Sequence, residues 1–159
     1  MRRTIGITLL GLTLAVHTVN AQRAEIGRKS MAGPRLGLTM LHRPGLPPVM
    51  TQFGWHFELD VRPTSTGPSL VLEEVLLAGG LEQDAFFPSA TLLMGVRTPG
   101  GLEVGIGPNV TLLGTALAVG VGKSLNYGGV SLPLNLAMVD APEGMRFTFL
   151  VGYAIPTSP

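Results

Sequence analysis

Charged side chains at every second position of one segment are the residues best placed to do chemistry in this chain. His56, Glu58, Asp60 and Arg62 alternate with apolar residues, and this alternation puts them on one face of a β-strand. Other charges occupy the same polar phase of later segments, and the whole set comprises His56, Glu58, Asp60, Arg62, Arg97, Glu103 and Arg146. An imidazole among acids and bases could act as a polar relay or bind a polar substrate.

The same set also fits a purely structural interpretation. A charge buried inside a protein must be paired, and a barrel of eight strands leaves little room for a channel. We therefore expect the seven residues to form a salt-bridge network, with a lumen that is packed rather than conducting.

The sequence supports an enzyme active site or a metal site less well than it supports a structural salt-bridge network. A lipid-modifying hydrolase needs a nucleophile, a base and an orienting acid within hydrogen-bond reach. Beyond residue 21 the histidines are His42 and His56, and no serine is forced close to either. The chain has no cysteine, and two separated histidines give no metal-ligand spacing. We expect no catalytic, metal or cofactor-binding residues, and a lipid-modifying outer-membrane enzyme remains a second alternative.

The elements that would position the charges are β-strands, because the dominant hydrophobic period is two. Eight alternating segments cover residues 34–42, 50–62, 69–79, 87–97, 101–108, 114–123, 128–139 and 145–155. Connections such as 98–101 and 140–144 are too short for crossover helices. The sequence predicts an all-β protein, a single eight-stranded antiparallel up-and-down β-barrel.

Two positions disturb the alternation. Glu73 and Glu74 are adjacent, so either a bulge puts both on one side or one of them lies at an edge. Pro133 cannot donate a ladder hydrogen bond, which predicts a bulge or a local break.

The period alone does not say which face of the barrel is apolar. In a membrane barrel the apolar face meets lipid, whereas in a soluble lipocalin-like barrel it lines a ligand cavity. Charged residues make up 13% of the chain, against about 25% in globular proteins, and this favours lipid. The expected lipid-facing residues are Phe53, Trp55, Phe57, Leu132, Leu134, Phe147, Phe149 and Tyr153. A soluble periplasmic or secreted lipocalin-like barrel that binds a hydrophobic ligand remains the alternative.

The N-terminus has the pattern of a secretory signal. Arg2 and Arg3 precede an apolar run, and Val19 and Ala21 suit a signal peptidase that cuts after Ala21. We expect a signal peptide at 1–21, a linker at 22–33, the barrel at 34–155 and a tail at 156–159. The mature part would carry nine basic and ten acidic residues. This balance lacks the excess of positive charge that nucleic-acid binding requires, so we expect no nucleic-acid partner.

With its leader, its eight alternating segments and its final strand 145–155, the chain resembles small bacterial outer-membrane β-barrel proteins. The resemblance implies a place in the outer membrane, contact with its lipid, and a structural or surface-interaction role rather than catalysis. With a periplasmic N-terminus, the loops near 43–49, 80–86, 109–113 and 140–144 would face outward. Phe86 and Phe87 could then contact a surface partner or anchor in lipid headgroups.

Overall fold

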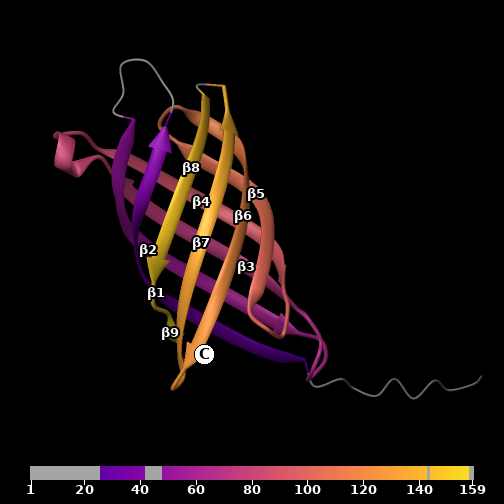
Figure 1. Cartoon of the computed structure of the whole chain (residues 1–159). Coiled ribbons are helices and arrows are strands. Elements are labelled where there is room, and N and C mark those ends of the chain that lie inside the picture. Colours follow the sequence, from indigo (N-terminus) through magenta and orange to yellow (C-terminus); the bar gives the residue numbers. More distant parts are fainter. Residues whose placement is uncertain (1–25, 42–47, 143, 158–159) are drawn as a thin grey trace, which may run out of the picture.

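The chain forms a closed antiparallel barrel in a computed structural model that describes residues 26–41, 48–142 and 144–157 (Figure 1). The long strands are β1 (Gly27–Leu41), β2 (Val49–Arg62), β3 (Ser69–Gly79), β4 (Phe87–Arg97), β5 (Leu102–Thr111), β6 (Gly114–Tyr127), β7 (Val130–Ala141) and β8 (Gly144–Gly152). A 3-10 turn η1 (Leu81–Gln83) precedes β4, and a two-residue strand β9 (Ile155–Pro156) follows β8. Among the described residues no helix is long and apolar enough to cross a bilayer.

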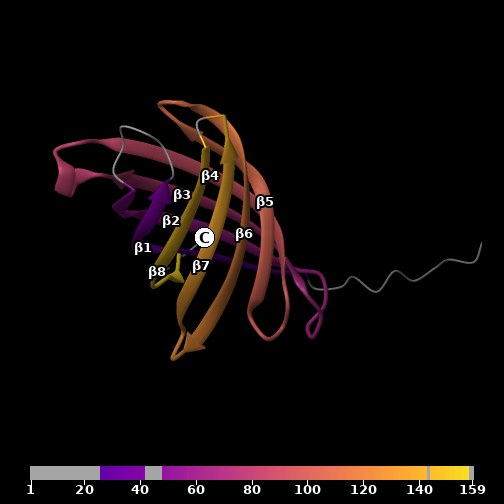
Figure 2. The same ribbon diagram turned by 45° about the horizontal axis from the view of Figure 1, so that its top comes forward.

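Each long strand pairs with its neighbour in sequence, and β1 closes the barrel. β1 pairs with β2 on one side and with β8 on the other, both antiparallel. The strands slant around a common interior, so those in front cross those behind (Figures 1 and 2). The predicted eight-stranded up-and-down barrel is confirmed.

The short strand β9 continues β8 in the same register. Gly152 pairs with Arg35, and Ile155 pairs with Ala32, so no residue is inserted between them. The interruption lies opposite Pro34, which has no N–H to donate to the ladder. Ala154 bridges to Ser131 of β7 just beyond Pro133, where the β7–β8 ladder is broken. The local break predicted at Pro133 is therefore confirmed.

The first strand is longer than its sequence pattern indicated. Residues 27–33, which we assigned to a linker, form the first half of β1 and pair with β2 from His56 to Arg62. This half carries no apolar alternation, because polar residues give way directly to the adjacent Met31 and Ala32. Backbone pairing with the long β2 holds it in the sheet.

The two adjacent acids of β3 need no bulge. β3 pairs without interruption to β2 and to β4, and its burial alternates strictly from Ser69 to Leu76. Glu73 is therefore buried in the lumen, while Glu74 points outward beside Phe57 and Leu92. The predicted bulge or edge position at these acids was wrong, since a regular central strand sends neighbours to opposite faces.

The outer wall is apolar and the inner wall is mixed. All eight residues expected to face lipid lie on the outer wall, with 38–56% of their surface exposed. The buried polar side chains belong to the opposite phase of the same strands. The apolar phase therefore points away from the lumen, which is the arrangement of membrane barrels.

Candidate functional site

Arg97 is the centre of a buried ion network inside the barrel. Its Nη1 and Nη2 donate to the two carboxylate oxygens of Glu58, at 2.5 and 2.8 Å, and its Nε donates to Glu103 at 2.7 Å. Nη1 also reaches Asp60 at 3.3 Å. A planar guanidinium suits this role, because its five N–H donors form a fixed fork that matches carboxylates.

The carboxylates are held in turn by neutral donors. Ser69 donates to Asp60 at 3.0 Å, and the Asn135 amide donates to Glu103 at 2.7 Å. Strands β2, β3, β4, β5 and β7 thus supply one connected cluster. We call Arg97, Glu58, Asp60, Glu103 and Glu73 the acid cluster, because four carboxyl groups surround one guanidinium.

His56 links the acid cluster to a second arginine. Its Nε2 lies 3.4 Å from Glu73, and its Nδ1 lies 2.6 Å from Nη2 of Arg35. Arg35, only 1% exposed, also donates to the carbonyls of Pro34 and Tyr153, at 3.2 Å each. Both of the largest fully buried side chains, Arg35 and His56, therefore belong to this network.

The tautomer of His56 follows from these contacts. A guanidinium only donates, so Nδ1 must accept and Nε2 must carry the proton that points at Glu73. His56, Glu58 and Glu73 are close enough together to hold a metal ion. However, a metal would have to replace the Nε2 proton and sit beside two guanidinium groups. The arrangement therefore fits a closed hydrogen-bond network better than a metal centre.

The structure brings together six of the seven predicted network residues. Glu58, Asp60, Arg97 and Glu103 belong to the acid cluster, and His56 contacts its Glu58 and Glu73. Arg62 lies at the barrel end with its side chain 47% exposed and forms an ion pair with Asp60 at 3.9 Å. Arg146 lies in the other half of the lumen, where it donates to Asn109 at 2.8 Å. Strand tilt separates residues of one phase along the axis, and the sequence pattern does not show this.

Sequence reasoning missed Arg35 and Glu73 as network members. Arg35 stands in the polar phase of its segment, and that phase was the available signal. The phase of Glu73 was hidden because β3 is apolar on both faces. His42 lies outside the described residues.

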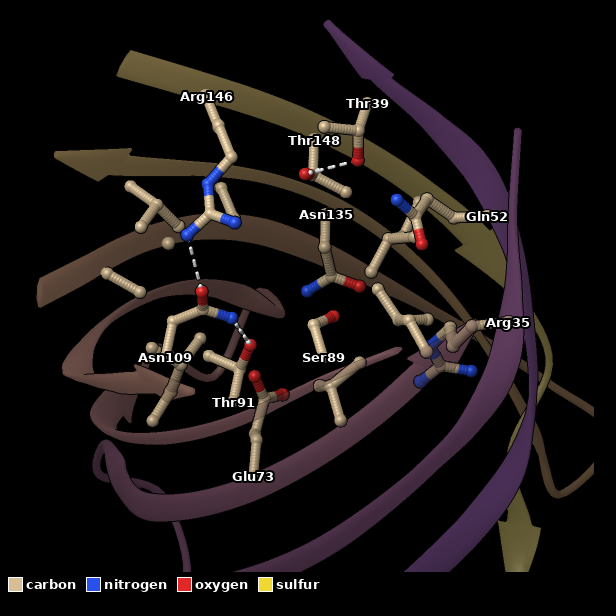
Figure 3. Close-up of a pocket in the computed structure, with 18 of the residues that line it drawn as sticks. Arg35, Thr39, Gln52, Glu73, Ser89, Thr91, Asn109, Asn135, Arg146 and Thr148 are labelled. Atoms are coloured by element: carbon tan, nitrogen blue, oxygen red, sulfur yellow. Dashed lines mark hydrogen bonds between the residues drawn. The ribbon is translucent and has the colours of Figure 1, made fainter. Parts of the chain in front are cut away.

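The other half of the lumen holds a cavity of about 220 Å³. It reaches from Glu73 and Glu103 up to the hairpin at Leu112 and Leu113. Polar side chains labelled in Figure 3 project into it, among them Gln52 and Thr91. Our expectation of a packed lumen therefore fails for this half, because small and branched residues leave the space unfilled.

The turns at 80–86 and 112–113 lie at one end of the barrel, opposite the turns at 63–68, 98–101 and 128–129 (Figure 1). We call the first end the loop end. Phe86 is 60% exposed there and Phe87 is half-buried, and both line the cavity. Glu82 accepts hydrogen bonds from the hydroxyl and the N–H of Thr51, and these lower the pKa of its carboxyl.

The architecture matches solved structures. The crystal structure of Ail, the attachment invasion locus protein of Yersinia pestis, aligns with a TM-score of 0.55 and 12% identity over 81% of this chain and 99% of that one. The fold is that of a small outer-membrane β-barrel. No protein-family model and no curated protein matches the sequence.

Two further structures of Ail align with this chain over the same barrel. The backbone structure in phospholipid bilayer nanodisc has a TM-score of 0.53 and 11% identity, over 81% of this chain and 100% of that one. The crystal structure in complex with the heparin analogue sucrose octasulfate has a TM-score of 0.54 and 10% identity, over 81% and 99%. At such identity the likeness concerns the fold.

Proposed function

We propose that the mature chain inserts into the bacterial outer membrane as a small, non-enzymatic barrel that acts through its loop end. The observation that carries this proposal is the apolar outer wall, which runs around a closed sheet. In water such a wall would be a large exposed hydrophobic patch, whereas lipid covers it without cost. Closure also leaves no strand edge unpaired in the hydrocarbon.

The soluble alternative requires the reverse arrangement. A lipocalin-like barrel turns its apolar phase inward and its charges outward. Here Phe53, Trp55 and Phe149 are exposed, while Arg35, His56 and Glu58 are buried. The lipocalin-like alternative is therefore the weaker one.

The acid cluster supports a structural rather than a conducting lumen. Arg97 of β4 bonds to carboxylates from the adjacent β5 and from β2, two strands away. Side chains joined in this way fill the cross-section of a barrel of eight strands. The described contacts of His56 are ion pairs and hydrogen bonds to Arg35, Glu58 and Glu73, which supports a structural role for its imidazole.

The acidic and apolar side chains at the loop end favour a surface partner that is not a polyanion. Ail was crystallised with a heparin analogue, whereas the described loop-end turn at 80–86 carries the acids Glu82 and Asp84. Apolar side chains stand beside them, with Leu81 at 59% and Leu112 at 74% exposure. We propose contact with an apolar or basic surface.

Heat modifiability tests the membrane proposal. The mature chain is folded in detergent, and its gel mobility is compared with and without boiling. We expect a mobility shift and insolubility when detergent is absent. A soluble monomer without detergent would contradict the proposal and favour the lipocalin-like alternative.

A further inference from the structure

The cavity above the acid cluster has the walls of a ligand site. Its lining is mostly apolar, and Leu93, Val139 and Leu150 are among the buried side chains that line it. An engineered apolar cavity of about 150 Å³ stays dry and binds benzene. The space here is about 220 Å³, so an alkyl group fits against the apolar part of the lining.

One polar group in the cavity lacks a partner. Gln52 is only 7% exposed, and its Oε1 accepts no hydrogen bond from the described residues. Its amide points into the cavity (Figure 3). A buried amide oxygen without a donor is destabilising. A hydroxyl can donate to the oxygen or accept from the amide nitrogen, so it satisfies Gln52 in either orientation of the amide.

The charges around the cavity favour a neutral ligand. The charged residues among the described lining are Glu73 and Glu103 at its inner end and the two arginines Arg35 and Arg146, so the acids and bases balance. Arg35 donates to His56 and to two carbonyls, and Arg146 donates to Asn109. A carboxylate or phosphate ligand would meet the acids at close range, and like charges repel strongly in a low dielectric.

The mouth suits an apolar molecule. The cavity reaches Phe87, Leu112 and Leu113 at the loop end. Leu112 is 74% exposed and Phe86 60%, so an alkyl chain can pass from the membrane surface along apolar side chains.

We propose that this cavity binds a neutral, medium-chain alkyl compound that carries one hydroxyl group. The chain packs against Leu93, Val139 and Leu150, and the hydroxyl bonds to the amide of Gln52. This site goes beyond the proposed surface role and does not depend on any partner at the loop end.

Methyl NMR in phospholipid nanodiscs tests the proposal, with 1-octanol as the ligand and n-octane as its analogue without a hydroxyl. We expect saturable shifts of the Leu93, Val139 and Leu150 methyls on adding 1-octanol. The outward Leu132 and Leu134 methyls report partitioning into lipid and should shift linearly. Equal, non-saturating shifts of inward and outward methyls would overturn the proposal.

Two variants locate the ligand. Ala137→Phe places a ring in the cavity and should abolish saturation, while Met138→Phe at its outward neighbour, which does not line the cavity, should keep it. Gln52→Leu preserves the side-chain size and should weaken 1-octanol binding about tenfold, the effect of one lost hydrogen bond, with n-octane unchanged. Undiminished 1-octanol binding by Gln52→Leu would overturn the assigned hydroxyl contact. Gel mobility before and after boiling verifies insertion separately, so failure of the membrane proposal would be recognised as such.

Discussion

Arg97 is the single residue on which the interior depends most. It bonds to Glu58, Asp60 and Glu103 at once. We expect Arg97→Met to lower the free energy of unfolding by about 3–5 kcal/mol, because several buried carboxylates lose their counter-charge. Urea unfolding in lipid vesicles measures the change. Arg62→Met is the matched control and should cost less than about 0.5 kcal/mol. The Arg62 side chain is half exposed, and its contact with Asp60 is long, at 3.9 Å. Equal losses would contradict the central role of Arg97.

Glu73 and Glu74 are chemically identical neighbours in opposite surroundings. Glu74 faces outward between Phe57 and Leu92 in the middle of β3. We expect Glu74→Leu to raise the free energy of unfolding in vesicles by about 1–2 kcal/mol, because an acid on the lipid face is costly. Glu73→Leu should lower it by about 1–3 kcal/mol, since His56 and Arg97 lose a buried partner. A loss of stability in Glu74→Leu would argue that this acid has a partner outside the barrel.

At the scale of the element, β7 shows how the two faces of one strand differ. Leu136 points outward near the middle of the strand, paired with Val121 and Phe149. We expect Leu136→Arg to cost about 2–4 kcal/mol, the value for arginine near the bilayer midplane. Vesicle insertion, followed by gel mobility without boiling, measures the effect. Leu112→Arg introduces the same charge at an exposed hairpin and should insert normally. Normal insertion of both variants would contradict a lipid-facing β7.

The register between strands decides at which height along the barrel each inward side chain lies. Phase alone placed His56, Glu58 and Asp60 on one face, and all three side chains are buried in β2. Phase did not predict that Arg146 would bond to Asn109 instead of joining the acid cluster. The height of a residue along the barrel axis depends on the stagger between strands, and stagger is a property of pairing.

At the scale of the whole molecule, the chain has a testable orientation. Leu112 is 74% exposed at the loop end, and Tyr127 is 86% exposed at the opposite end. The chain has no native cysteine. We expect Leu112→Cys to react with a membrane-impermeant maleimide on intact cells, and Tyr127→Cys to react only after lysis. The reverse pattern would place the loop end in the periplasm and contradict the proposed surface role.

The sequence by itself determined the strand count, the antiparallel order and the two faces. Period-two alternation is local, because successive side chains of a strand must point to opposite sides. The limits of β3 and β4 follow directly from the pattern. The start of β1 does not, because residues 27–33 have no alternation and are held by pairing with β2.

Only the tertiary structure decided how the interior is divided. Arg35, Glu73 and Arg97 come from three strands, and their meeting depends on closure and stagger. The cavity beside them exists because side chains from many strands fall short of filling one volume. Alternation tells which side chains point inward, whereas the distances between strands tell which of them touch and where space remains.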